Sequence, residues 1–494
     1  MKIFHMSDSH IGRSHFNEDS FNKAINYYRK NKFDLFIHSG DLTQGGSLKQ
    51  FEEAKNLFDD VKEPKVFIPG NHDKRSGGIS IYKNLFGDPT GVKEINDTAV
   101  IYIDSAVADT NLGRVGTLKY NFIKNCLKKY QNKSLKIIVL HHHILPIPRT
   151  GRERNVLSNA GDLLDLILRY DVDLVLLGHR HYPNVYQVEQ TVFVNAGTVS
   201  DKKTRHGDVN SFNIINVNDK NIDVTIRRMN DSELKNSYKR NKRKLFYDFG
   251  KRLKRIAHIS NSFISTSNNF KYTYFLNSIK KINRMDIDFV IHCGGIVERG
   301  IRRNYELAER LIKKLDPPVY FTPAGRDINY LGYHLFEEYF GDFDQSYSDE
   351  DFLFQGVSSA QYDSKIGIIG RNERDNILNQ IQDENVKFKA IFFHHNVVPI
   401  PHAREKGLLE DSGDLLKTIL RKKINLVLTG TSSHPFAVMI DNTIIVNANS
   451  VSSVFHRSVY GNSFNVIDIY EKNIVVYEIN SLWGTRRVLG MWER

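Results

Sequence analysis

The chain has 494 residues and carries 69 Lys and Arg against 57 Asp and Glu, so its formal net charge is +12. Its hydrophobic content of 40% excludes general disorder. The length allows two or more domains, because single hydrophobic cores stop growing at roughly 250 to 300 residues. Two cysteines are too few for a disulfide framework, and no segment has the apolar character of a signal peptide or a membrane helix. We therefore expect a folded cytoplasmic protein without a membrane span.

The first half of the chain alternates between two hydrophobic patterns. Short apolar runs bounded by Gly, Pro or polar clusters have the length of buried strands and cover residues 35–37, 66–68, 137–140 and 174–177. Between these runs, apolar residues recur at helical spacing, as in Phe21, Ala24, Ile25 and Tyr28. Strands that alternate with amphipathic helices predict an α/β fold.

Side chains of metal-binding type follow almost every predicted strand of this half. They are Asp8 and His10, Asp41, Asn71 and His72, His141, and the pair His179 and His181. Loops at the carboxyl ends of strands in an α/β fold converge on one crevice, so we expect these side chains to meet there. Such groups are costly to bury without partners, and no structural need explains so many of them together. The pattern therefore predicts a metal centre.

A basic segment separates the two halves of the chain. Residues 227–255 hold twelve Lys or Arg and three Asp or Glu, a net charge of +9 that accounts for most of the charge of the protein. Aromatic residues lie between these charges, which is typical of proteins that bind single-stranded nucleic acid. The segment also fits an amphipathic helix, with Leu245, Phe246, Phe249 and Leu253 on one face. A nucleic-acid surface and a solvated basic connector both stay open.

The second half repeats the first. Residues 65–73 match 319–327, residues 137–148 match 390–401, and residues 192–196 match 444–448. The aligned positions 73 and 327, 141 and 394, and 195 and 447 differ by the steady offsets 254, 253 and 252. We therefore expect two copies of one fold: an active domain at 1–228, a basic linker or helix at 229–255, and a second domain at 256–494.

The residues at the predicted strand ends carry a family resemblance. In this order they are Asp8-x-His10, Gly40-Asp41, Gly70-Asn71-His72-Asp73, His141 and Gly178-His179-x-His181. The set resembles the calcineurin-like metallophosphoesterase superfamily and covers the first half. The segment that runs from residues 151–157 to residues 195–198 also resembles prokaryotic, phosphodiesterase-like members of this superfamily. The resemblance implies two tandem metallophosphoesterase sandwiches, each with four layers in the order α/β/β/α.

The resemblance also implies a centre of two divalent transition-metal ions, about 3.5 to 4 Å apart. One ion would be held by Asp8, His10, Asp41 and His181, and the other by Asp41, Asn71, His141 and His179. Asp41 would bridge the pair, because two close cations need a shared anionic ligand. Mixed oxygen and imidazole ligands suit Mn, Fe, Zn or Co, and Mn is the favoured ion here.

In the catalysis that this resemblance implies, a hydroxide that bridges the metals attacks the phosphorus in line. His72 protonates the leaving oxygen or, alternatively, only supports the site through a hydrogen bond. Asp73 orients His72 or caps the loop. The residues left open between a role in the site and a structural or solvent-exposed one are His142, His143, Arg152, Arg154 and Arg180.

The second copy departs from the pattern at nearly every ligand. The positions aligned with Asp8, His10, Asp41, Asn71, His72, His179 and His181 hold Asn261, Phe263, Gly295, Gly325, Arg326, Thr431 and Ser433. His394, aligned with His141, is the ligand type that persists. Without the bridging carboxylate this copy lacks the charge to hold a metal pair, so we expect a degenerate, catalytically inactive domain. We expect it to form an intramolecular pseudo-dimer with the first copy, with a role in capping the substrate as the alternative.

Together these patterns favour a metal-dependent phosphodiesterase that hydrolyses a nucleotide-type or small phosphodiester. One alternative is a nuclease of the repair-exonuclease branch of the same superfamily, with residues 227–255 bound to nucleic acid. Another is an adaptor on nucleic acid or a membrane surface in which catalysis is vestigial. The complete ligand set of the first half counts against the adaptor, because a vestigial site is expected to lose ligands.

Overall fold

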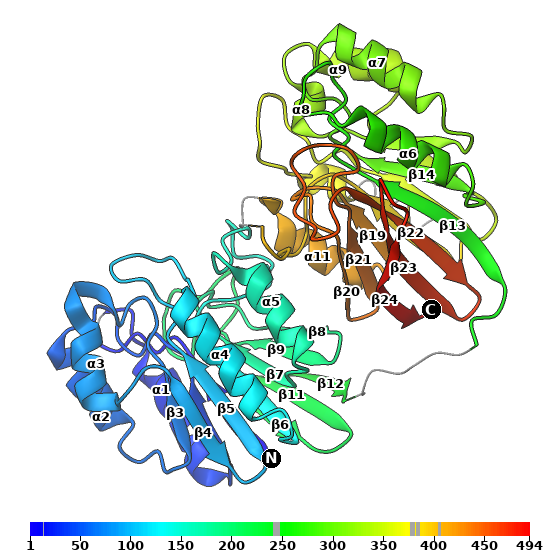
Figure 1. The fold of residues 1–494 in the computed structure, drawn as a ribbon. Helices are drawn as coiled ribbons and strands as arrows, with labels where there is room; N and C mark the ends of the chain where they lie inside the picture. Colours follow the sequence, from blue (N-terminus) through cyan, green and yellow to red (C-terminus); the bar gives the residue numbers. More distant parts are fainter. Residues whose placement is uncertain (13, 241–247, 376–380, 382–385, 404–406) are drawn as a thin grey trace. The chain divides into compact units, whose positions relative to one another are not determined.

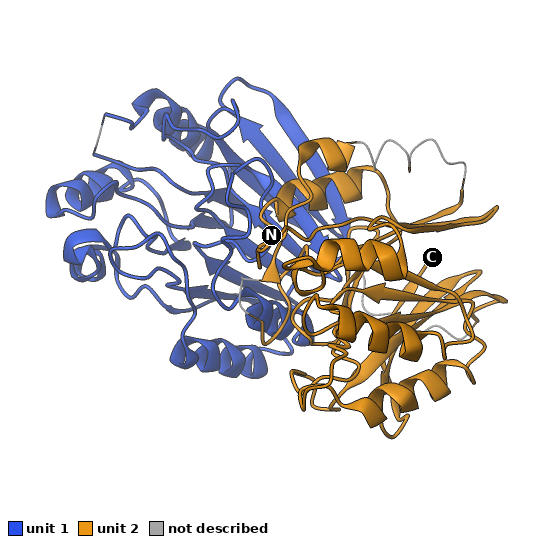
Figure 2. Cartoon of the chain, turned by 90° about the horizontal axis from the view of Figure 1, so that it is seen from above, with its two compact units in different colours: residues 1–244 blue, residues 245–494 orange. Residues whose placement is uncertain are grey.

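The computed structural model describes residues 1–12, 14–240, 248–375, 381, 386–403 and 407–494. The chain divides into two compact units, residues 1–244 and residues 245–494, which are blue and orange in Figure 2. Each unit contains mixed α/β layers and is described by itself.

One sheet of the first unit has the strand order β12-β11-β10-β1-β2-β3. Its strands are β1 (Lys2–Met6), β2 (Leu35–His38), β3 (Lys65–Phe67), β10 (Ser211–Val217), β11 (Asn221–Arg228) and β12 (Glu233–Lys239). Strands β1, β2 and β3 are parallel, whereas β10, β11 and β12 extend the sheet by antiparallel pairing. The carboxyl ends of the three parallel strands therefore lie at the same edge.

A second sheet of this unit has the order β8-β9-β7-β6-β5-β4. Its strands are β4 (Gly91–Ile95), β5 (Thr98–Ile103), β6 (Leu135–Leu140), β7 (Leu174–Leu177), β8 (Asn184–Val188) and β9 (Thr191–Asn195). Strands β5, β6, β7 and β9 are parallel to one another. This sheet also gathers the ends of its parallel strands at one edge.

The two sheets face each other across a core, and helices cover their outer faces. Ile3 and Ile37 of one sheet share a buried cluster with Val100, Ile137 and Leu174 of the other. The helices are α1 (Glu18–Lys30), α2 (Leu48–Leu57), α3 (Gly78–Phe86), α4 (Thr117–Lys129) and α5 (Ala160–Arg169). Helices α1 to α3 pack on the β1 and β2 face, and α4 and α5 lie over β5, β6 and β7 (Figure 1). The predicted α/β/β/α sandwich is confirmed.

The second unit has the same arrangement of strands. One sheet has the order β24-β23-β22-β13-β14-β15, and the other β20-β21-β19-β18-β17-β16. The first contains β13 (Arg252–Ile259), β14 (Phe289–Cys293), β15 (Val319–Thr322), β22 (Ser463–Tyr470), β23 (Asn473–Asn480) and β24 (Arg486–Glu493). The second contains β16 (Ser346–Ser348), β17 (Phe352–Gly356), β18 (Phe388–Phe392), β19 (Leu426–Thr429), β20 (Phe436–Ile440) and β21 (Thr443–Asn447).

Helices of the second unit cover its sheets in the same way. They include α6 (Tyr272–Ile282), α7 (Arg302–Ile312), α8 (Gly325–Ile328), α9 (Gly332–Phe340) and α11 (Ser412–Arg421). Helices α6, α7 and α9 bury Phe275, Tyr305 and Phe336 in one cluster with strand β13, and α11 lies near β19 and β21 (Figure 1). Across the described parts of the chain, every helix is either too short or too polar to serve as a membrane span. The packing of the two units as a pseudo-dimer stays a prediction.

The basic junction differs from the linker or helix predicted over 229–255. Residues Glu233–Lys239 form strand β12, which pairs with β11 along seven residues, and Arg252 begins strand β13. The reason is packing: Tyr238 contacts the core between the sheets of the first unit, and Arg255 pairs with Asp468 of the second, with Nε and Oδ1 2.6 Å apart. Residues 241–247 of the predicted segment lie outside the described residues.

Candidate metal centre

The predicted ligands of the first unit lie directly after parallel strands. Asp8 and His10 follow β1, Asp41 follows β2, and Asn71 and His72 follow β3; on the other sheet His141 follows β6, and His179 and His181 follow β7. The structure brings all eight side chains together at the common strand edge. Three groups have ligand atoms within 4.8 Å of one another: Asp8, His10 and His181; His10, Asp41 and His72; and Asp41, His141 and His179.

The loops that carry these residues have a strained backbone. The φ angles of Asp8, His10 and Asp41 are 56°, 51° and 55°, in the left-handed region that side chains other than glycine rarely adopt. Backbone bonds hold the conformation, since the Asp8 amide donates to the Gly40 carbonyl at 2.9 Å and the His10 amide to the Asp41 carbonyl at 3.1 Å. Strain of this kind costs about 1–3 kcal/mol per residue and is typical of functional sites.

The first group of donors is formed by Asp8, His10 and His181. Asp8 Oδ1 lies 3.2 Å from His181 Nε2 and 3.8 Å from His10 Nε2, and the two Nε2 atoms are 3.0 Å apart. Asp8 Oδ1 and His10 Nδ1 are buried, and no described residue forms a hydrogen bond with either. Buried polar atoms without partners are costly. A cation bound between these side chains would satisfy the Asp8 oxygen.

The second group is formed by Asp41, Asn71, His141 and His179. Asp41 Oδ2 is 3.3 Å from His141 Nε2. Asn71 Oδ1 lies 3.2 Å from His141 Nε2 and 2.9 Å from His179 Nδ1. Asp41 Oδ2 is also 3.7 Å from His10 Nε2, so this carboxylate stands between the two groups.

Backbone carbonyls orient two of the imidazoles. His141 Nδ1 donates to the Ser39 carbonyl at 2.8 Å, and His181 Nδ1 donates to the Lys203 carbonyl at 3.0 Å. Each ring therefore turns its Nε2 atom toward the centre, as metal-binding histidines do. Gly70 is required beside them, because a Cβ there would lie 2.1 Å from Asp41 Oδ1.

The charges of the centre favour ionised carboxylates. Burial raises the pKa of the Asp8 carboxyl, but His181 and His10 more than offset burial and hold it well below its ordinary value. Burial lowers the pKa of His141, but the Asp41 carboxylate overcomes it and raises the pKa to about 9. Burial and the neighbouring histidines lower the pKa of His179, so this ring is neutral and able to act as a ligand. This set of oxygen and imidazole donors fits two divalent transition-metal ions.

His72 lies beside this centre in a neutral form. Its amide donates to Asp41 Oδ1 at 2.8 Å, and its Nδ1 donates to the Gln44 carbonyl at 2.9 Å. Arg75 Nη2 donates to His72 Nε2 at 3.1 Å. Burial lowers the pKa of His72, and His10 and Arg75 act in the same direction. Arg75, which the sequence patterns did not single out, therefore occupies the edge from which His72 would donate a proton.

Asp73 ties the loops together and does not orient His72. Its two carboxylate oxygens accept from the amides of Leu42, Thr43 and Gly70 at 2.7 to 3.0 Å. Of the two roles predicted for Asp73, the structure supports the one that caps the loop.

Some of the remaining predicted neighbours have structural contacts, and others lie at the rim of the site. His142 Nδ1 is 3.0 Å from Ser105 Oγ, and His143 stacks on His179 with ring centroids 5.8 Å apart. Arg180 donates to the carbonyl of Thr150 at 2.9 Å and also bonds the carbonyl of Gly151, so it fixes that loop. In the same loop Arg152 is exposed and Arg154 is half-buried.

Sequence reasoning missed Asp201. Its Oδ2 atom lies 3.9 Å from His10 Nε2 and 3.8 Å from His181 Nδ1. It stands in a loop after β9, 20 residues beyond the last motif histidine, and therefore had no motif to mark it.

Comparison with known proteins shows what this part of the chain is similar to. Residues 1–183 match the family model described as calcineurin-like phosphoesterase, and this range contains every predicted metal ligand. The match lies within the first unit.

Several relatives match the same part of this chain at low identity. A probable cyclic nucleotide phosphodiesterase of Coxiella burnetii is 25% identical over 40% of this chain and 82% of its own length. The 3',5'-cyclic adenosine monophosphate phosphodiesterase CpdA of Escherichia coli is 25% identical over 31% of this chain and 56% of its own length. A 3',5'-cyclic-nucleotide phosphodiesterase of Nostoc is 26% identical over 30% of this chain and 56% of its own length. The chain thus spans about half the length of the last two relatives.

Solved structures also match this chain, at low identity. A dimetal phosphatase from Danio rerio covers 49% of this chain and 100% of its own, with a TM-score of 0.38 and 10% identity. A purple acid phosphatase from yellow lupin covers 59% of this chain and 60% of its own, with a TM-score of 0.40 and 12% identity.

Proposed function

We propose that the first unit is a metal-dependent phosphodiesterase that hydrolyses a nucleotide-type or small phosphodiester. The observation that carries this proposal is the position of Asp41, whose Oδ2 is 3.3 Å from His141 Nε2 and 3.7 Å from His10 Nε2. One carboxylate therefore serves two groups of ligand atoms, as a pair of close cations requires. The activities named for the Coxiella, Escherichia coli and Nostoc relatives support a phosphodiester as the substrate.

The residues of the two donor groups would share a pair of divalent ions. Asp8, His10, Asp41 and His181 would hold one ion, and Asp41, Asn71, His141 and His179 the other. When bound, such ions supply positive charge to the phosphoryl oxygens and lower the pKa of a nearby water. Mn is the ion we favour, and Fe, Zn and Co suit the same donors.

His72 is the proposed proton donor to the leaving oxygen. For this role the neutral ring must first take up a second proton from solvent at Nε2, because its own hydrogen is on Nδ1 and is donated to the Gln44 carbonyl. The contact between Arg75 and His72 Nε2 must then open when substrate binds. Arg75 would then bind the phosphate of the substrate, since a guanidinium pairs well with a phosphoryl group.

The metal assignment is tested by Asp41→Asn. We expect the purified protein to hold about two transition-metal ions per chain and to cleave bis(4-nitrophenyl) phosphate faster than 4-nitrophenyl phosphate. Asp41→Asn should lose bound metal and lower kcat at least about 100-fold, because the bridging charge is gone. The exposed Asp59, changed to Asn, is the matched control and should leave both measurements unchanged. Undiminished hydrolysis by Asp41→Asn would sink the assignment.

The role of His72 is tested by the dependence on the leaving group. If His72 donates a proton, His72→Gln should slow the release of an alkoxide or nucleoside by about 100-fold or more, and slow the release of 4-nitrophenolate much less. An equal loss for both leaving groups would assign His72 a supporting hydrogen bond instead. The measurement is kcat for a pair of diesters that differ only in that group.

A substrate panel on the manganese-loaded protein tests the substrate class. The panel holds cyclic nucleotides, glycerophosphodiesters, single- and double-stranded nucleic acid and phosphomonoesters. We expect a small or nucleotide-type diester to give the highest kcat/KM. Preferred cleavage of nucleic acid with a steep salt dependence would favour the nuclease instead. Local ion pairs reduce the free charge of the basic segment, since Arg227 pairs with Glu233 at 2.5 Å and Arg240 with Asp173 at 2.8 Å.

A further inference from the structure

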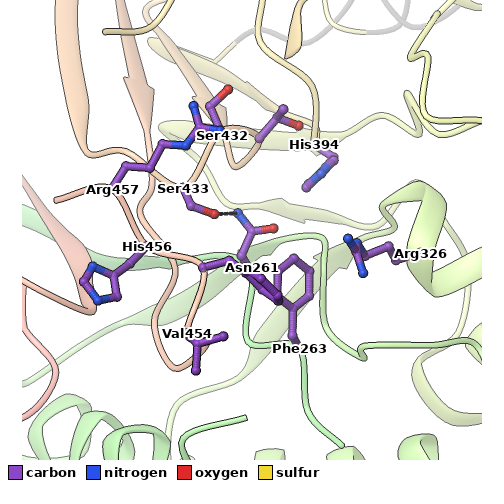
Figure 3. Close-up of a pocket in the computed structure, with 11 residues that line it drawn as sticks. Asn261, Phe263, Arg326, His394, Ser432, Ser433, Val454, His456 and Arg457 are labelled. Atoms are coloured by element: carbon purple, nitrogen blue, oxygen red, sulfur yellow. Dashed lines mark hydrogen bonds between the residues drawn. The ribbon is translucent and has the colours of Figure 1, made fainter. Parts of the chain in front are cut away.

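A cavity of about 540 Å³ opens in the second unit at the strand ends that correspond to the metal centre of the first. It is lined by Asn261 and Phe263 after β13, Arg326 in α8, His394 after β18, Thr431, Ser432 and Ser433 after β19, and Val454, Phe455, His456 and Arg457 after β21 (Figure 3). A cavity of this size suits a small organic ligand.

The lining carries the opposite charge to the metal centre. Among the described residues it contains two arginines and two histidines and no carboxylate. Asn261 stands where the first unit has Asp8, and Arg326 stands where the first unit has His72. The first site is built to attract cations, whereas this one is built to attract an anion.

Arg326 is held at the cavity by an aromatic ring. Its guanidinium lies 5.1 Å from the centre of the Phe263 ring, and Figure 3 shows it extending from α8 toward that ring. It is exposed, and no carboxylate of the described residues lies within ion-pair distance of it. An arginine stacked on an aromatic ring is ordered before a ligand arrives, which lowers the entropy cost of binding an oxyanion.

Arg457 supplies a second cation from another loop. Its guanidinium donates to the backbone carbonyl of His402, and its amide donates to the Ser433 carbonyl at 2.9 Å. A carbonyl partner does not neutralise the positive charge of Arg457, and no carboxylate of the described residues lies within ion-pair distance of it. The first unit has Arg205 at the aligned position.

Polar groups complete the floor of the cavity. Asn261 Nδ2 donates to Ser433 Oγ at 3.1 Å, which leaves the Ser433 hydroxyl hydrogen free to donate (Figure 3). Thr431 Oγ1 is buried, and no described residue forms a hydrogen bond with it. His394 Nδ1 donates to the Cys293 carbonyl at 2.7 Å, so its Nε2 is free to accept. Two hydroxyl donors near two arginines suit the oxygens of a phosphate.

Two aromatic rings also line the cavity. The rings of Phe263 and Phe455 meet edge to face, with centroids 6.5 Å apart. Phe455 is 52% exposed and its neighbour Val454 is 40% exposed. An exposed aromatic ring beside arginines offers a stacking surface for a flat heterocycle.

We propose that this cavity is a metal-independent binding site for a phosphate ester with a planar organic part, of the nucleoside monophosphate class. The phosphate lies against Arg326, Arg457 and the Thr431 and Ser433 hydroxyls, and the base lies against Phe455. The site binds without hydrolysis, because its described lining has no carboxylate to hold a metal ion. This assignment does not depend on the activity of the first unit.

The test measures binding to the full-length protein in the presence of EDTA. Isothermal titration calorimetry compares adenosine 5'-monophosphate, inorganic phosphate and adenosine. We expect the nucleotide to bind more tightly than either part alone, and Arg326→Ala and Arg457→Ala to weaken it about tenfold or more each. Arg303→Ala removes an exposed arginine of the same unit outside the cavity and should change nothing.

Three outcomes overturn the proposal: no binding at millimolar nucleotide, binding that requires added metal ion, or binding that both arginine variants leave intact. Arg326→Lys guards against a folding defect, because it keeps the charge but loses the flat guanidinium. We expect it to retain part of the affinity and the wild-type melting temperature.

Discussion

The two units hold the same loop geometry around different side chains. In the first, the amides of Asp8 and His10 donate to the carbonyls of Gly40 and Asp41; in the second, the amides of Asn261 and Phe263 donate to Gly294 and Gly295, both at 2.9 Å. The left-handed backbone is also kept, with φ of 50° at Asn261 and 49° at Phe263. Phenylalanine rarely adopts this conformation. The sheets and their hydrogen bonds therefore set the loop conformation, and metal ligands are not needed to maintain it.

The polar residues around the two sites fall into two sets. One set is the same in both units. His38 and His292 each have Nε2 2.6 Å from a serine hydroxyl. Asp73 and Asp327 each accept hydrogen bonds from three or more loop amides. The other set, the ligands, is replaced in the second unit. Residues of the first set hold the framework, and residues of the second set are the predicted metal ligands of one unit.

The largest expected effect is on stability, from removal of the framework carboxylates. Asp73→Ala and Asp327→Ala each leave buried loop amides without acceptors, among them those of Thr43 and Gly70 or of Gly295 and Ala324. We expect each variant to lose about 3–5 kcal/mol of unfolding free energy. Urea unfolding followed by circular dichroism measures it.

The control for this pair is Asp59→Ala, an exposed aspartate that should change the unfolding free energy by less than about 0.5 kcal/mol. If Asp327→Ala behaved like this control while Asp73→Ala was destabilising, the framework role would belong to the first unit alone and the comparison would break.

Much of this architecture was predictable because its signals are local. Apolar runs at strand length and helical stripes such as Phe21, Ala24 and Ile25 depend only on which residues are buried, and these are buried as expected. The eight strand-end residues were also brought together, because carboxyl ends of parallel strands share an edge. Their roles as ligands stay predictions.

Other features were hidden because they depend on distant contacts. The basic segment has the composition of a connector, but β12 forms because β11 offers a free edge and the core accepts Tyr238. Asp201 and Arg75 have no motif and become visible only through their distances to His10 and His72.

A smaller effect is expected from acid. Burial, followed by the nearby His394 and His258, lowers the pKa of His292 to about 3, against about 6.5 in the unfolded chain. The stability that neutral His292 contributes is therefore full above pH 6.5 and is lost as the pH falls toward 3. The slope is about 1.4 kcal/mol per pH unit for one histidine. Unfolding free energies measured between pH 7 and pH 4 should fall steadily.

His292→Gln isolates this group, because glutamine still reaches the Ser262 hydroxyl but does not titrate. The slope of its unfolding free energy against pH should be smaller than that of the wild type by about 1.4 kcal/mol per pH unit. His38→Gln in the first unit is the matched variant, since burial also lowers the pKa of His38 to about 3. A slope that neither variant alters would show that these histidines take up protons in the folded state.

The smallest expected effect tests the prediction that the second unit cannot hold a metal pair. Asn261→Asp with Phe263→His restores two ligand types on a backbone that already has the left-handed φ of Asp8 and His10. We expect no added metal per chain and no added hydrolysis, because Gly295 supplies no bridging carboxylate and a Cβ there would meet Asn261 Oδ1 at 2.5 Å. The metal content is measured by atomic emission in an Asp41→Asn background, so that it reports on the second unit alone. Tight binding of one metal ion by this variant would show that the bridge is dispensable and that backbone geometry alone directs the site.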